Sequence, residues 1–253
     1  MLADDTPEAW RDALDARAEQ LLATAGVVEP PIDMLRVAAT LGFVVAIDRR
    51  LAVRARHVQL SAAADDGTGA AILLQPEPRV ERRHWAVAHE IGEHYAYAVF
   101  AELGLDSEVL HAAVRERTAN ALANRLLLPS SWFFADGRLC DWDLARLKRR
   151  YVTASYELIA RRSLEAEAPA IVTIFDQGKL TLRRGTATAR VPRLTEIERI
   201  VWLKSATNGR PREHVDHRCR VRVWPIHEPQ WKREIMRTEW PGEAVDAEDA
   251  AND

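Results

Sequence analysis

Cysteine is scarce in this sequence of 253 residues, which contains only Cys140 and Cys219. The two cysteines are far apart and form no Cys-x-x-Cys pair, so the sequence supplies neither a disulfide framework nor a thiolate cage for zinc. A chain that does not depend on disulfides suits a reducing compartment. We therefore expect a cytoplasmic protein.

Long apolar runs are also missing, since no stretch approaches the roughly 18 consecutive apolar residues of a membrane-spanning helix. Residues 1–5 lack the basic and apolar regions of a secretory signal. Charge of one sign is not in excess either, because 35 Lys and Arg oppose 38 Asp and Glu. A balanced chain has no general basic field for nucleic acid or for a membrane surface. We expect no membrane association, and DNA binding is the less favoured expectation.

Apolar residues make up 47% of the chain, enough for a real hydrophobic core. Their periodicity predicts a mixture of helices and short strands, and hence an α+β fold. The expected helices cover residues 7–25, 82–103 and 107–128, with two short helices in 144–164 and another at 194–205. The expected strands cover residues 43–47, 51–60 and 70–74, which form a small antiparallel sheet, then a hairpin at 171–184 and a strand at 218–223.

The segment from His89 to His94 reads H-E-I-G-E-H and lies in the expected helix 82–103. In the H-E-x-x-H pattern of zinc peptidases, two histidines four residues apart lie about 40° apart on one helix face, because each residue advances the helix by about 100°. Both can then bind one zinc ion, and the glutamate after the first histidine acts as general base toward the bound water. Glu90 occupies that position here.

The second histidine is displaced by one residue relative to this pattern. Glu93 stands four residues after His89, whereas His94 lies about 140° around a regular helix from it. A single π-helical turn, eased by Gly92, would bring His94 beside His89. The zinc dipeptidyl peptidases with the motif H-E-L-L-G-H are similar, and there both histidines bind the metal. We favour His94, because deleting Glu93 leaves the common form of the motif.

The alternative keeps the helix regular and makes Glu93 the second ligand, since carboxylate oxygen and imidazole nitrogen bind zinc at similar distances. In either case the ionisable residues of the motif lie within an otherwise apolar run, where burial without a partner is costly. A metal ion is the simplest partner. Zinc is the expected ion, and manganese is compatible with the same ligands.

A catalytic zinc needs a third protein ligand and one coordination position open to water. Residues 115–129, R-E-R-T-A-N-A-L-A-N-R-L-L-L-P, resemble the E-x-x-A-N-x-F-A-x-x-L-L-M-P helix of the ImmA/IrrE family of metallopeptidases. The order of elements over about residues 30–130 is similar to that family as well. The resemblance implies that Glu116 is the third zinc ligand. The chain departs from the family in the extra residue of the metal motif and in Leu122, where the family has phenylalanine.

The resemblance also implies a domain organisation and a function. Residues 1–135 are expected to form a zincin-like metallopeptidase domain of the gluzincin type, and 136–168 a helix-turn-helix-like segment. A C-terminal α+β module at 169–242 and a disordered acidic tail at 243–253 follow. Known relatives cleave a helix-turn-helix transcriptional repressor in stress or mobile-element responses. The chain is therefore expected to be a zinc-dependent endopeptidase that cleaves a protein partner, with Glu90 as the proton acceptor.

Two other functions stay open. The irregular motif suggests a catalytically weakened regulator that binds DNA or a repressor, and the six-residue spacing suggests a dipeptidyl peptidase or an aminopeptidase. Weaker signals favour structural roles: the basic residues at 148–150 and 161–162 as a solvated face, and the tryptophans of the second half as packing. His214, His217 and Cys219 fit no standard zinc spacing and favour a loop without metal.

Overall fold

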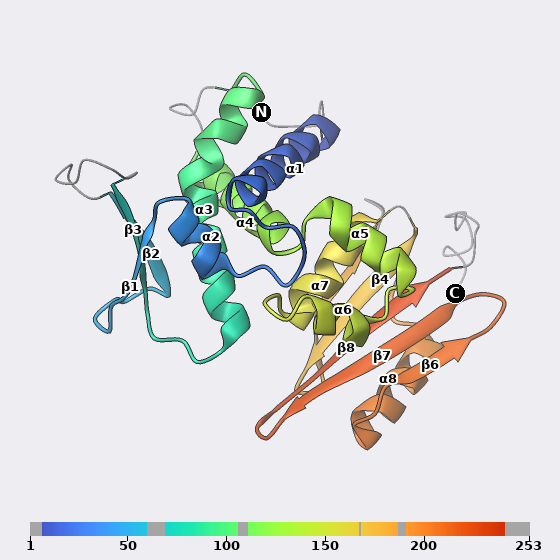
Figure 1. The fold of residues 1–253 in the computed structure, drawn as a ribbon. Coiled ribbons are helices and arrows are strands. Elements are labelled where there is room, and N and C mark those ends of the chain that lie inside the picture. Colours follow the sequence, from blue (N-terminus) through green and yellow to red (C-terminus); the bar gives the residue numbers. More distant parts are fainter. Residues whose placement is uncertain (1–6, 60–68, 106–110, 167, 187–190, 241–253) are drawn as a thin grey trace. The chain divides into compact units, whose positions relative to one another are not determined.

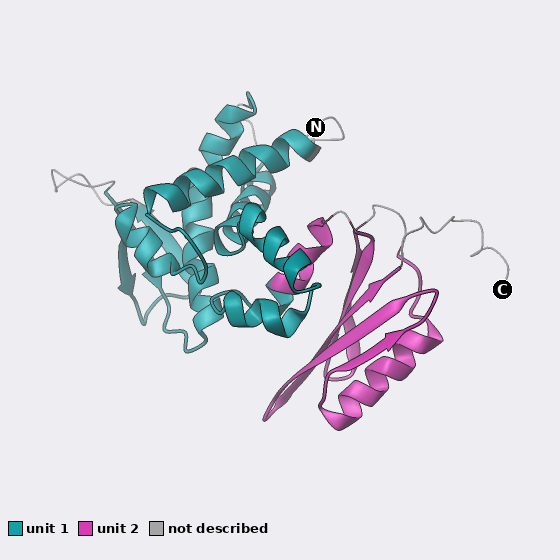
Figure 2. Cartoon of the chain, turned by 45° about the vertical axis from the view of Figure 1, so that its right-hand side comes forward, with its two compact units in different colours: residues 1–158 teal, residues 159–253 magenta. Residues whose placement is uncertain are grey.

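The structure, a computed structural model, describes residues 7–59, 69–105, 111–166, 168–186 and 191–240 (Figure 1). The chain forms two compact units, residues 1–158 and 159–253 (Figure 2). Each combines helices with a small sheet, which confirms the predicted α+β class. Within the described ranges, no helix is long and apolar enough to cross a membrane. The predicted acidic tail lies outside the described residues.

The first unit is mainly helical. Its helices are α1 (Pro7–Thr24), α2 (Met34–Thr40), α3 (Val80–Glu102), α4 (Ala112–Leu127), α5 (Ser130–Leu139), α6 (Leu144–Arg150) and α7 (Tyr156–Arg162), the last of which continues into the second unit. Pro129 ends α4 as predicted, but α5 begins directly after it, and the sequence pattern did not predict this helix. Proline suits that position because its missing N–H is not required at a helix start.

The sheet of the first unit contains β1 (Val44–Ile47), β2 (Ala55–Gln59) and β3 (Ala70–Leu74) in the order β1-β3-β2. β2 pairs with β3 in antiparallel fashion, whereas β1 pairs with β3 in parallel. The expectation of an antiparallel sheet is therefore corrected to a mixed one. The reason is topological: the chain reverses direction twice between β1 and β3, so these two strands point the same way and lie side by side.

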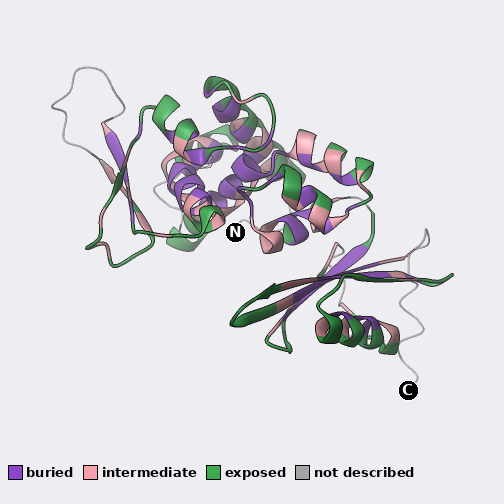
Figure 3. Ribbon diagram, turned by 60° about the horizontal axis from the view of Figure 1, so that its bottom comes forward, coloured by how far each residue is buried: buried purple, intermediate pink, exposed green. Residues whose placement is uncertain are grey.

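Helices α3 and α4 pack closely because α3 carries a glycine at their contact. A Cβ atom added to Gly92 would lie 2.5 Å from the carbonyl oxygen of Ala119, far inside van der Waals contact. Both residues are buried, and buried positions are purple in Figure 3. The close approach brings the first turns of α4 beside the middle of α3, where the H-E-I-G-E-H segment lies.

The second unit is built on a five-stranded antiparallel sheet in the order β5-β4-β8-β7-β6. Its elements are the 3-10 helix η1 (Ser163–Glu165), β4 (Ala170–Asp176), β5 (Lys179–Gly185), α8 (Glu196–Asn208), β6 (Arg212–Val215), β7 (Arg220–Glu228) and β8 (Trp231–Glu239). The predicted hairpin is confirmed as β4 and β5, with positive φ at Gln177 and Gly178 in its turn. Helix α8 packs on one sheet face over an apolar cluster that includes Phe175 and Met236.

Candidate metal centre

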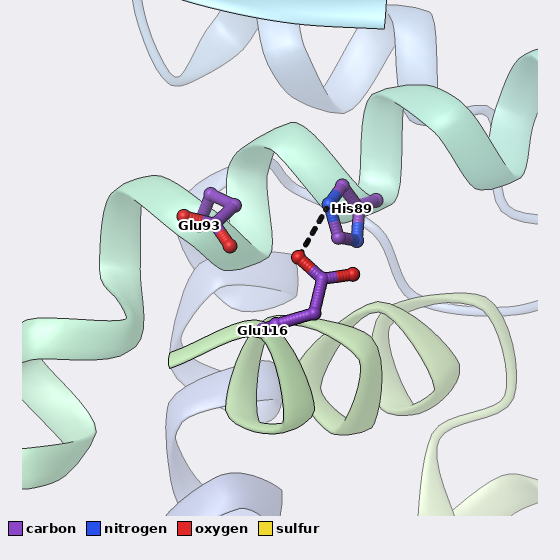
Figure 4. Close-up of side chains that lie close together, drawn as sticks. All are labelled: His89, Glu93 and Glu116. Carbon is purple, nitrogen blue, oxygen red and sulfur yellow. Dashed lines mark ion pairs between the residues drawn. The ribbon is translucent and has the colours of Figure 1, made fainter. Parts of the chain in front are cut away.

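Three ligand-type side chains converge between α3 and α4 (Figure 4). His89 and Glu93 come from one face of α3, and Glu116 comes from the second turn of α4. One ligand atom from each lies within 4.8 Å of the other two, and the Nε2 atom of His89 is 3.8 Å from a carboxylate oxygen of Glu116. This group could hold a metal ion.

The distances and the donor atoms of this group fit a divalent cation. Ligand atoms about 2.0–2.2 Å from a tetrahedral zinc ion lie about 3.4 Å from one another, so the observed separations require only small side-chain movements. Those movements are available because the Glu116 side chain is 56% exposed. One imidazole nitrogen and two carboxylate oxygens suit zinc, and they suit manganese as well.

Asn120 connects two members of the group. Its side-chain oxygen lies 3.2 Å from Nδ1 of His89, and its amide nitrogen donates a hydrogen bond to Glu116 at 3.0 Å. A hydrogen bond from Nδ1–H of His89 to Asn120 leaves Nε2 free to bind a cation. The indole of Trp85 stacks on the same imidazole, with ring centroids 5.2 Å apart. Sequence patterns alone assigned no role to Asn120, although its place four residues after Glu116 puts both side chains on one helix face.

Glu90 lies beside this group and is 8% exposed. Burial raises the pKa of Glu90 above the ordinary carboxylate value, and the nearby carboxylates of Glu93 and Glu116 raise it further. His89 and a hydrogen bond from the backbone N–H of His57 lower the pKa in part. A carboxylate with a raised pKa is a better proton acceptor for acid–base chemistry.

His94 lies elsewhere. Its Nδ1 atom is 3.2 Å from Nε2 of His57 on β2, and its ring contacts the edge of Phe43. Helix α3 is α-helical throughout, so the π-helical turn that would bring His94 beside His89 does not occur in it. A regular helix turns Glu93 toward Glu116 and His94 toward β2. The structure therefore brings Glu93 together with His89 and Glu116, which is the alternative ligand set. It does not bring His94 to them, as the favoured ligand set required.

A cavity of about 580 Å³ is lined by His89, Glu93 and Glu116 and also by the neighbouring histidines His57 and His94. Glu90 is part of the same lining. Arg115 also lines the cavity, and its guanidinium lies 3.6 Å from the carboxylate of Glu93. The cavity thus combines ligand-type side chains, a carboxylate with a raised pKa and access for a small molecule or a peptide segment.

The weaker sequence signals lie in structural contacts. Lys148 donates hydrogen bonds to the carbonyl oxygens of Val152 and Ala154 and to Glu81, which holds the turn between α6 and α7. Arg162 is 2% exposed and pairs with Glu165. Hence these two basic residues are held within the fold.

The histidines near β6 do not gather a third ligand-type residue around one point. His214 lies 3.1 Å from Asp216, and Cys219 is buried in the apolar cluster under α8. Over the ranges that the structure describes, His89, Glu93 and Glu116 are the one set of three or more His, Cys, Asp or Glu residues whose ligand atoms all lie within 4.8 Å of one another.

A solved structure named "Mycobacterium tuberculosis transcriptional regulator" resembles this chain with a TM-score of 0.63 and 15% sequence identity. The match covers 92% of this chain and 81% of that chain. No protein-family model matches the sequence, and no curated protein matches it. What these comparisons show is an α+β fold shared with a protein that bears the name of a transcriptional regulator.

Proposed function

We propose that this chain is a metal-dependent peptidase of the ImmA/IrrE type, with zinc as its ion and a cytoplasmic protein as its substrate. The observation that carries the proposal is the position of Glu90. A buried carboxylate with a raised pKa lies next to a group of side chains suited to a divalent cation, in the same cavity. This combination suits a bound cation better than it suits stability, because Glu93 and Glu116 place further negative charge beside the buried Glu90.

In the proposed centre, His89, Glu93 and Glu116 hold the cation. A divalent ion held there would supply Lewis-acid activation of a water molecule and of the scissile carbonyl group. Glu90 accepts the proton of the attacking water and delivers it to the nitrogen of the leaving amine. The backbone N–H of His57 orients the Glu90 carboxylate. Asn120 keeps the His89 ring in the tautomer that binds through Nε2.

The proposed substrate is a helix-turn-helix transcriptional repressor. This part rests on the resemblance of residues 115–129 to the family helix and on the name of the structural neighbour, which is a transcriptional regulator. Hydrolysis of a repressor would release the genes that it silences, in a stress or mobile-element response.

A second candidate is a regulator that has the same fold and binds DNA or a repressor without cutting it. Two observations favour it. The structural neighbour carries a regulator's name, and Glu93 stands where the common peptidase motif has histidine. By contrast, His94 points away from His89, so the resemblance to the dipeptidyl peptidase motif gains no support from the geometry.

The test is cleavage of helix-turn-helix repressors from the same organism by the full zinc-loaded chain, with new termini identified by mass spectrometry. The wild type is expected to cleave the repressor, whereas Glu90→Gln and the chelator-treated wild type are expected not to cleave it. Glu90→Gln is expected to retain the wild-type zinc content. The control Glu19→Gln changes an exposed residue of α1 and is expected to cut normally. Undiminished cleavage by Glu90→Gln would overturn the role of Glu90. Repressor or operator binding without any cleavage would establish the second candidate.

A further inference from the structure

Besides the group of three ligand-type residues, the cavity contains a pair of histidines that the proposed hydrolysis does not use. His57 projects from the edge strand β2 and His94 from α3, and both line the cavity. Nε2 of His57 and Nδ1 of His94 are 3.2 Å apart. The ring of Phe43 is T-shaped to both imidazoles, with its centroid 6.0 Å from that of His57 and 5.0 Å from that of His94.

We infer that His57 and His94 bind a second divalent cation, next to the one assigned to His89, Glu93 and Glu116. The inference rests on the proposed function because both places lie in the same cavity. Two imidazole nitrogens on one tetrahedral zinc ion, each about 2.0–2.1 Å from it, lie about 3.3 Å apart. The observed 3.2 Å separation matches that value, so the pair requires almost no movement to share an ion.

Glu93 faces the first group, and its carboxylate would have to turn to reach a second ion as well. It precedes His94 in α3, belongs to the first group and acts electrostatically on the ring of His57. A carboxylate has two oxygens and can offer one to each ion, and ions in two-metal hydrolases lie about 3.5–4 Å apart. Arg115, which now pairs with Glu93, would then be displaced by the second cation.

The simpler interpretation of the pair is a hydrogen bond in which one neutral ring donates to the other. In that arrangement one of the two facing nitrogens carries a proton. Binding of a cation only requires this proton to move to the other nitrogen of the same ring, which faces away from the partner. No net charge on either imidazole is needed for that change.

The number of ions bound per chain decides between these interpretations. The full chain is stripped with chelator, dialysed and titrated with zinc alone by calorimetry, with bound metal counted by mass spectrometry. The wild type is expected to bind two ions, and His57→Ala and His94→Ala one each. The control His217→Ala, an exposed histidine of the second unit, is expected to bind two.

A wild-type chain that binds one ion, with no loss in His57→Ala or His94→Ala, would overturn the second site. If that single ion is lost in His89→Ala, the proposed metal centre stands and the second site alone fails. If the wild type binds no ion, both proposals fail.

A measurement on the unmodified chain guards against variants that fail to fold. With manganese added to saturation, two ions that share the Glu93 carboxylate are expected to give a spin-coupled electron paramagnetic resonance spectrum, since ions in two-metal hydrolases lie about 3.5–4 Å apart. A spectrum of uncoupled manganese only would overturn the inference.

Discussion

Buried carboxylates occur in both units of this protein, and their surroundings differ. In the second unit, Glu198 is 1% exposed and accepts hydrogen bonds from the guanidinium of Arg183 and the hydroxyl groups of Thr195 and Thr238. Glu234 is 2% exposed and bonds to two side chains in the same sheet-and-helix layer. These carboxylates have cationic and neutral donors around them, and they hold α8 and the sheet together.

In the first unit, the carboxylate of Glu90 is 8% exposed and has two other carboxylates, Glu93 and Glu116, as neighbours. Like charges around a cavity destabilise the fold unless a cation joins them. Burial alone therefore does not separate structural from functional carboxylates. Their surroundings do: Glu198 is paired with a buried guanidinium, whereas Glu90 has two carboxylate neighbours at a cavity, where His89 and Arg115 offset part of the like charge.

The largest expected effect concerns the structural side of this comparison. Glu198→Ala leaves the Arg183 side chain, 9% exposed, buried without its carboxylate. Such a loss costs about 3–5 kcal/mol of unfolding free energy. Urea denaturation followed by tryptophan fluorescence measures it. The matched variant Glu116→Ala, at an exposed position of the first unit, is expected to change the metal-free stability by less than about 0.5 kcal/mol. Equal losses in both variants would remove the distinction between the two regions.

The next effect concerns the helix contact that assembles the metal group. Gly92→Ala puts a Cβ atom against the carbonyl oxygen of Ala119, so α3 and α4 must separate. Overpacking of this kind costs about 1–3 kcal/mol, and we expect zinc affinity to fall as well because Glu116 moves with α4. Gly104→Ala is the control, because its added Cβ meets nothing within 4 Å, although its φ of +67° makes alanine strained. Both variants are expected to lose stability, but only Gly92→Ala is expected to lose zinc affinity. Unchanged zinc affinity in Gly92→Ala would contradict the close-approach argument.

A smaller effect is expected from the residue that links two of the ligands. Asn120→Ala removes the partner of Nδ1 of His89 and the amide bound to Glu116. Loss of such an outer partner lowers metal affinity by about 10- to 100-fold. Competition with a zinc-binding dye measures the change. Asn124→Ala, one turn further along α4, is the control and is expected to bind zinc as the wild type does. If both variants bind equally tightly, Asn120 does not position His89.

The smallest effect concerns a structural histidine that does not line the cavity. His84 is 5% exposed, and its Nδ1 accepts a hydrogen bond from the backbone N–H of Met34 at 3.1 Å. Burial lowers the pKa of His84 below its ordinary 6.5, although Asp33 raises it in part. The neutral form is therefore favoured by folding, so its contribution to stability is present above about pH 6.5 and is lost as pH falls toward the folded-state value.

This dependence can be measured as the urea midpoint of the wild type at pH 7.5 and at pH 5.5. His84→Gln retains an acceptor that does not titrate in this range, so a smaller difference between the two midpoints is expected. His217→Ala, at an exposed histidine, is expected to show the wild-type difference. A pH difference that is the same in His84→Gln and the wild type would contradict the assignment.

The sequence predicted most helices and the first hairpin of the second unit because their patterns are local. It missed β8, whose residues Trp231–Glu239 include five charged side chains although the strand has buried positions on both faces. Those charges have partners on other segments, such as Asp176 for Arg233. A strand stabilised by such distant ion pairs looks like an exposed loop in a linear pattern, so periodicity does not detect it.

What the sequence determined by itself was the α+β class and the location of the candidate chemistry: His89, Glu90 and Glu93 in one helix and Glu116 in the next. Local spacing fixes which residues share a helix face, and that information is contained in the chain order. The tertiary structure decided that Glu93 rather than His94 meets Glu116, that Asn120 joins the group and that His57 faces His94. These outcomes depend on how closely α4 packs at Gly92 and on where β2 lies, and both are set by contacts between segments distant in sequence.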